Sequence, residues 1–106
     1  MNMGFFHAFT QLTAAGVTTA LNVGDLTEHV LQYKVAAIND NVVLRMEGSV
    51  DGTNFFNLSS ENVDVTVVAN ETNAFVYSGK VNYIRGRFVS ETGGTDATVD
   101  FSYTGR

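Results

Sequence analysis

The chain has 106 residues, a length that supports one hydrophobic core and therefore one domain. Apolar residues make up 44% of it and charged residues 16%, a balance that argues against a disordered chain. The net charge is −5 with only six Lys and Arg, which disfavours a nucleic-acid-binding surface. Cysteine is absent from the sequence, so disulfides and thiolate metal sites are excluded.

The N-terminal stretch is free of charge: the first Lys, Arg, Asp or Glu is Asp25. It is too polar for a membrane span, and it lacks the basic start and continuous apolar run of a signal peptide. Two interpretations remain open, because these residues can form core strands or can pack against another chain. Residues 1–12 are therefore predicted to be an edge strand or a docking arm. Its candidate interface residues are Phe5, Phe6, Phe9 and Leu12.

The next two apolar segments, residues 17–23 and 29–38, are predicted to be strands. In the first, alternate positions from Val17 to Val23 share one face. The second also fits a helix capped by Thr27, but its short length and its neighbours favour a strand.

Residues 42–58 carry the clearest alternation in the chain, beginning with VVLRMEGSV. The alternation stops at Asp51 and Gly52, a pair that tolerates the positive φ angles of a tight hairpin turn. Apolar residues resume at Phe55 and Phe56, one of which is expected to anchor the core. We predict a central hairpin here, in which Asp51 and Gly52 have a structural role.

Turn residues divide the rest of the chain into short strands at 63–69, 74–78, 81–90 and 97–104. The total is eight or nine strands, with turn signals every eight to twelve residues and no substantial helix. This pattern predicts a single all-β domain over residues 1–106. Its architecture is expected to be an antiparallel β-sandwich, with a jelly roll as the favoured version.

The sequence offers no arrangement typical of catalysis. The two histidines, His7 and His29, lie in or next to apolar strands, where a structural role is the more common one. The eleven acidic residues are spread singly, and no metal-ligand spacing occurs. We therefore expect no enzymatic activity, no cofactor and no metal.

Two arginines are the remaining candidates for a binding site. Arg85 and Arg87 share one face of the strand at 81–90 and could contact an anion or a partner protein. Pairing with Glu47 or Asp100 across neighbouring strands is the alternative interpretation.

Two parts of the sequence resemble known families. The run EGSVDGTNFFNL, from Glu47 to Leu58, resembles the hairpin of discoidin-like, galactose-binding-like jelly rolls, which implies a core hairpin but no ligand. The succession AFTQLTAAGVTTALNV, LRMEGSVDGTNFFNL and VNYIRGRFVSETGGTDATVDFSYTGR is similar to small virion proteins of tailed bacteriophages. That resemblance covers most of the chain and implies a β-sandwich attached to a viral shell in many copies.

The resemblance implies a capsid decoration (cement) protein, made in the host cytoplasm and bound outside a phage head. Its partners would be the major capsid protein and sister subunits, with a trimer held by the first strand as one form. The same fold in a tail or baseplate is an alternative. A carbohydrate-binding jelly roll is another, and its candidate stacking residues are Tyr33, Tyr77, Tyr83 and Tyr103. No nucleic-acid or membrane partner is expected.

Overall fold

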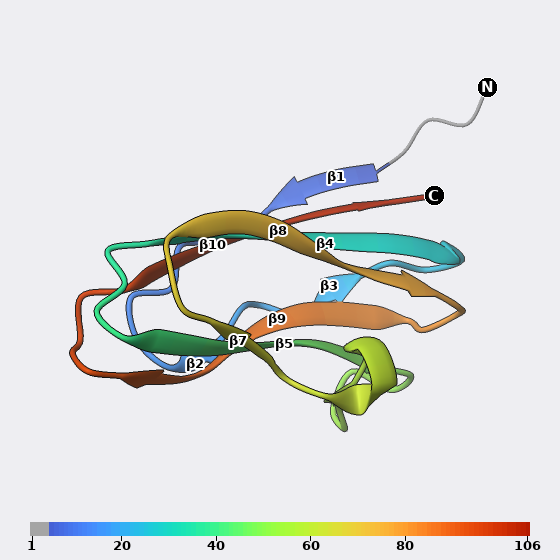
Figure 1. The fold of residues 1–106 in the computed structure, drawn as a ribbon. Coiled ribbons are helices and arrows are strands. Elements are labelled where there is room, and N and C mark those ends of the chain that lie inside the picture. The colour runs from blue at the N-terminus through green and yellow to red at the C-terminus, as the bar shows by residue number, and fades with distance from the viewer. Residues whose placement is uncertain (1–4) are drawn as a thin grey trace.

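The structure, a computed structural model, describes residues 5–106 and consists of two antiparallel sheets packed face to face (Figure 1). The four-stranded sheet has the order β1-β10-β4-β8. Its strands are β1 (Phe5–Ala8), β4 (Glu28–Ala36), β8 (Glu71–Ser78) and β10 (Thr98–Gly105). The six-stranded sheet is built on the long strands β5 (Asn41–Ser49) and β9 (Tyr83–Thr92). Short strands line its two edges: β2 (Gly16–Val17), β3 (Leu21–Asn22), β6 (Phe56–Asn57) and β7 (Val65–Val67).

The strand order is that of a jelly roll. β2 and β3 both pair with β9, and β6 and β7 both pair with β5, so each short pair acts as one interrupted strand. Counted this way, the chain has eight strands, and the first, eighth, third and sixth in chain order (β1, β10, β4 and β8) form one sheet. The second, seventh, fourth and fifth form the other. The predicted all-β sandwich is confirmed, and within residues 5–106 the one helical segment is the three-residue 3₁₀ turn η1 (Ser60–Asn62).

The core lies between the two sheets and is built from the inward positions of their long strands. Leu44, Met46 and Phe88 are fully buried on the inner face of the six-stranded sheet. Leu31 and Phe101 are their buried counterparts on the four-stranded sheet. These side chains follow the period of two, so alternation in the sequence identified them correctly.

The predicted continuous strand at 17–23 is wrong. Pairing with β9 is interrupted at Thr18, a polar residue that is buried. Thr18 replaces regular pairing with two contacts: its amide donates to the Gly86 carbonyl, and its Oγ1 accepts from the Gly86 amide, each at 3.0 Å. The chain is drawn inward at Thr18, and pairing resumes only at Leu21.

The hairpin at 42–58 is real, but its predicted core anchor is wrong. Phe56 is exposed and Phe55 is half-buried on the outer surface, whereas Leu58 is buried. Leu58 lies against Gly48, where an added Cβ would stand 2.5 Å from the Leu58 Cδ1. The connection from Ser49 to β6 is a six-residue loop, Val50 to Phe55, instead of a tight turn, so the apolar residues on its far side are displaced from the expected register.

Two further strand boundaries differ from the prediction. β7 begins at Val65 instead of at residue 63, and Val63 is exposed, because Glu61 and Asn62 adopt left-handed backbone angles that redirect the chain. β8 begins at Glu71, inside the segment that was predicted to be a turn. Pairing with β4 holds these polar residues in a strand although their composition is typical of a loop.

Candidate interaction surface on the four-stranded sheet

The outer face of the four-stranded sheet carries an apolar row that crosses all four strands. Strand register places Phe6 beside Thr104, Thr104 beside Val30, and Val30 beside Val76. Phe6, Val30 and Val76 are apolar and Thr104 contributes a methyl group; Phe6 and Val76 are exposed, at 70% and 72%. We call these four residues the apolar row. Exposed apolar side chains aligned in one patch are typical of interaction sites, whereas single ones are normal on any protein.

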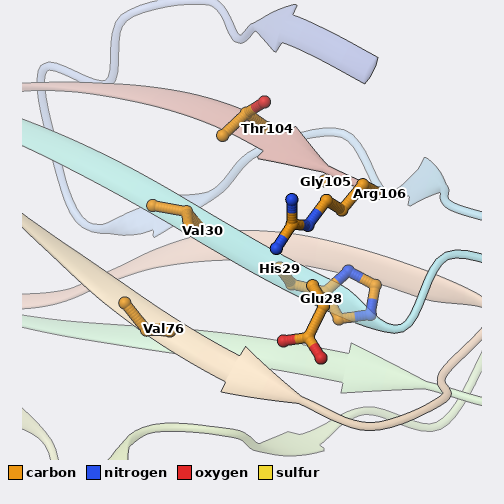
Figure 2. A pocket seen from close by; sticks show the side chains of 7 residues that line it. All are labelled: Glu28, His29, Val30, Val76, Thr104, Gly105 and Arg106. Carbon is orange, nitrogen blue, oxygen red and sulfur yellow. The ribbon is translucent and has the colours of Figure 1, made fainter. Parts of the chain in front are cut away.

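Two shallow hollows lie along the apolar row. One, of about 310 Å³, lies beside Val30 and Val76 near the end of the sheet (Figure 2). Figure 2 shows Glu28 and Arg106 at the end of this hollow, with the His29 ring behind it. The other, of about 200 Å³, lies between Phe6 and Val30. The surface is therefore gently contoured and open, a shape that suits a protein partner better than an enclosed small molecule.

Charge is confined to the two ends of this face. On one side of the apolar row the neighbouring row is uncharged, since it consists of Ala8, Ser102, Gln32 and Ala74. Charged residues occur one row beyond it, where Lys34 is beside Asp100, and directly on the other side of the apolar row, where Glu28 pairs with Arg106. An apolar centre with charges at its rim is the general anatomy of a protein–protein interface.

The structure separates the four N-terminal interface candidates into two kinds. Phe6 points out to solvent on β1, and Phe5 is partly exposed with its ring 6.3 Å from that of Tyr103. Phe9 and Leu12 instead pack against the core, and Leu12 exchanges two backbone hydrogen bonds of 2.9 Å with Val99. The part of residues 1–12 that the structure describes is thus an integrated edge of the sandwich, and residues 1–4 lie outside the described residues.

Arg85 and Arg87 lie on the opposite layer, far from the apolar row in the fold. Their guanidinium groups face Glu47, with N–O distances of 2.8 Å from Arg85 and 3.5 Å from Arg87. A third guanidinium, from Arg45, reaches the same carboxylate at 3.2 Å. The Glu47 side chain is only 4% exposed. The pairing with Glu47 that was one of the two predicted alternatives is confirmed, while Asp100 belongs to the other sheet.

Arg45 and Arg85 also contact residues of the chain other than Glu47. Arg45 makes a two-point contact with Asp64, at 2.8 and 3.0 Å, and this bond lowers the pKa of Asp64 and raises that of Arg45. The Arg85 guanidinium lies over the Phe55 ring, 3.7 Å from its centre. These contacts hold β5, β9 and the loop before β7 together. The geometry is that of a structural clamp.

The buried histidine is likewise engaged on both ring nitrogens. His29 Nδ1 lies 2.6 Å from the Tyr103 hydroxyl, and Nε2 lies 3.0 Å from the Gly79 carbonyl oxygen. Burial lowers the pKa of His29 and raises that of Tyr103 to about 12, so both side chains favour their neutral forms. The pair links β4 to β10 beneath the outer face.

The Asp51 turn supplies its own hydrogen-bond donors. Asp51 Oδ1 accepts from the amides of Thr53 and Asn54 at 2.8 Å, and Oδ2 accepts from the Asn54 side chain at 2.9 Å. These bonds hold the pKa of Asp51 well below its ordinary value. Gly52 has φ +80°, which is the left-handed angle predicted for this position. The loop thus has the geometry of a structural turn.

Within residues 5–106, no group of three or more His, Asp or Glu is arranged to hold a metal ion. No helix in the same part of the chain is long and apolar enough to span a membrane. Two of the four candidate sugar-stacking tyrosines, Tyr33 and Tyr103, are buried in the core and offer no exposed ring face.

Comparison with known proteins supports the architecture. No protein-family model and no curated protein matches the chain. Among solved structures, the crystal structure of SPBc2 prophage-derived protein YomS is similar, with a TM-score of 0.62 and 14% identity. The match covers 98% of this chain and 96% of that chain. The two chains share one fold.

Sequence reasoning missed most of the apolar row. Val30, Val76 and Thr104 were recognised as strand residues, but nothing in the pattern indicated that they align with Phe6. The available signal was Val30, an apolar residue on the same strand face as Gln32 and Lys34. Register across four strands, which brings the four residues together, is not visible in a single sequence.

Proposed function

We propose that this chain is a structural protein of a tailed-phage virion, and specifically a capsid decoration protein bound to the outside of the head. The observation that carries the proposal is the apolar row, which has an uncharged row on one side and charged residues toward both ends of the sheet face, on an acidic chain. The origin of the structural neighbour in a prophage supports a phage setting, since the match extends over nearly the whole of both chains.

The attachment we propose is non-covalent and uses the outer face of the four-stranded sheet. Phe6, Val30 and Val76 would be buried against the major capsid protein, and the charged ends would form the polar rim. Complete burial of one such side chain contributes about 1.5–3 kcal/mol. A modest contact of this kind suits a protein that a shell binds in many copies.

Co-sedimentation with phage heads that lack this protein tests the attachment. We expect the wild-type chain to sediment with heads at a fixed stoichiometry. Phe6→Ser removes apolar area and Thr104→Lys places a charge in the uncharged centre, so both should sediment at least tenfold less. Val50→Ser is the matched control, because Val50 is 65% exposed but lies directly after β5 of the other sheet.

Heads that bind Phe6→Ser and Thr104→Lys as well as wild type would refute attachment through this face. Deleting residues 1–12 is a poorer test, because Phe9 and Leu12 pack against the core and their loss would disturb the fold itself.

The position of the protein on the virion distinguishes the tail or baseplate alternative from attachment to the head. Gold-labelled antibody against the chain, viewed by electron microscopy on intact virions, should mark heads. Labelled tails or baseplates would move the proposal to that assembly. A glycan array tests the carbohydrate-binding alternative, and we expect no specific hit.

A further inference from the structure

We propose that β8 is a self-association edge, where two copies of this chain pair their β8 strands antiparallel across a twofold axis. The two four-stranded sheets would then form one continuous sheet. This contact uses a sheet edge, so it goes beyond the proposed attachment through the outer face and does not depend on it.

The first reason is the orientation of the β8 backbone. β8 pairs with β4 on one side, and no other strand among residues 5–106 pairs with its opposite side. Glu28 of β4 exchanges both its backbone hydrogen bonds with Arg106, on the β10 side, each at 3.0 Å. Because bonding alternates from one side to the other along an antiparallel strand, His29 and every second residue after it bond to β8. The register then leaves four residues of β8 with N–H and C=O groups directed outward: Thr72, Ala74, Val76 and Ser78.

One of these outward groups already uses a substitute partner. The Ala74 amide donates to the side-chain Oδ1 of its neighbour Asn73 at 2.8 Å. A neighbouring strand would offer a backbone carbonyl in the same direction and release the Asn73 side chain. The edge therefore has the donors and acceptors that strand addition requires.

The second reason is that β8 lacks the features that normally protect an edge strand. Its sequence, ETNAFVYS, contains no Lys, Arg or Pro, and Glu71 at one end is its sole charge. Its register with β4 runs without a bulge from Glu71 to Ser78. Exposed edges of monomeric proteins are usually short, bulged or charged, because a long and regular edge invites pairing with another chain.

The third reason is apolar surface on both sides of this edge. Val76 is exposed on the outer face of the sheet, and Val63, in the segment that leads into β7, is 61% exposed. Between β8 and that segment runs an open groove of about 440 Å³, lined by Val63, Val65 and Phe75 among others. A strand added to β8 would cover the groove and would place a side chain beside Val76 on the outer face.

A second copy of β8 satisfies all of these requirements. The antiparallel pair can be centred on Ala74, Phe75 or Val76. In each case, residues of one copy whose N–H and C=O groups point away from β4 lie opposite residues of the same kind in the other copy. The two Glu71 carboxylates would lie toward opposite ends of a ladder about 27 Å long, so no like charges meet. A twofold contact closes on itself, which limits the association to a dimer and avoids fibres.

Disulfide trapping tests the contact directly, since the chain has no cysteine of its own. The double variant Ala74→Cys with Val76→Cys places thiols opposite each other in each of the three registers, at Cα separations that a disulfide tolerates. Under mild oxidation we expect a covalent dimer. Ser102→Cys with Thr104→Cys is the matched control, because it has the same spacing on an interior strand of the same face, and it should form no covalent dimer.

Light scattering after size exclusion gives the independent measurement. Wild type should be a dimer, and Val76→Lys, which puts two like charges into the contact, should be a monomer with an unchanged circular dichroism spectrum. Val50→Lys, at a comparably exposed valine in the loop after β5 of the other sheet, should remain a dimer. A wild type that is monomeric at the highest measured concentration, or trimeric, would overturn the proposal. Equal trapping of the two cysteine pairs would overturn it as well.

Discussion

Glu47 of β5 and Arg85 of β9 face each other across the outer surface of the six-stranded sheet, with 2.8 Å between the Arg85 Nε and the Glu47 Oε1. Glu47 is nearly buried beneath three guanidinium groups. Its charge is therefore the one that holds the arginine cluster together. The sequence indicated Arg85 and Arg87 as candidates for a partner contact. In the structure they instead join β9 to β5, the two longest strands of the six-stranded sheet.

Replacing this carboxylate should destabilise the domain. We expect Glu47→Gln to lower the free energy of unfolding by about 2 kcal/mol, since the three guanidinium groups lose their shared counter-charge. The loss stays below the 3–5 kcal/mol typical of a fully buried pair, because the arginines keep contact with water. Urea denaturation measures the difference. Asp25→Asn, at an exposed ion pair with Lys80, is the control and should change stability by less than about 0.5 kcal/mol.

Gly86 of β9 packs closely against the Phe101 ring of the opposite sheet. A Cβ at this position would stand 2.7 Å from the ring carbons of Phe101 on the opposite sheet. We expect Gly86→Ala to cost about 1–3 kcal/mol through overpacking of the core. Gly16→Ala is the control, because the nearest atom to its added Cβ is 3.9 Å away. Thermal unfolding of both variants makes the comparison, and equal melting temperatures would contradict the packing described here.

The buried Leu58 should matter more than the exposed aromatic residue two positions earlier. We expect Leu58→Ala to cost about 2–4 kcal/mol, because it opens a cavity above Gly48. Phe56→Ala removes a larger side chain, but one that is 47% exposed, and should cost under about 1 kcal/mol. Chemical denaturation of the two variants tests this order. The reverse order would restore Phe56 as the core anchor of the hairpin.

The pH dependence of stability should carry a contribution from His29. Burial lowers its pKa below the ordinary value of 6.5, so the unfolded chain binds the proton more tightly than the folded one. The contribution is therefore fully present above about pH 6.5 and is lost as the pH falls below that value. We expect the free energy of unfolding to decrease between about pH 6.5 and pH 5, a window above the carboxylate range.

Histidine titration by NMR measures the pKa of His29 without a substitution. The His29 resonance should titrate below pH 6.5. In denaturation experiments His29→Gln should weaken the decrease in stability. A His29 pKa above 6.5 would contradict the burial and bonding described for this ring.

Alternation predicted the core because the long strands obey it: Leu44, Phe88 and Phe101 all occupy expected inward positions. The predictions failed where a side chain took over a backbone role, as Thr18 does beside Gly86, or where left-handed residues redirected the chain before Val63. Neither event leaves a periodic signal. The same limit applies to the interaction surface, since the sequence indicated Phe6 but the apolar row depends on register between strands distant in the sequence.

The position of β10 has a consequence for synthesis of the protein. This strand lies between β1 and β4, although it is made about sixty residues after β4 ends, so the four-stranded sheet cannot assemble until it leaves the ribosome. Until then β1 and β4 lack their shared neighbour, and the core positions that Phe101 and Tyr103 fill stay open. Translation that stops before β10 should therefore yield an aggregation-prone chain instead of a smaller folded one.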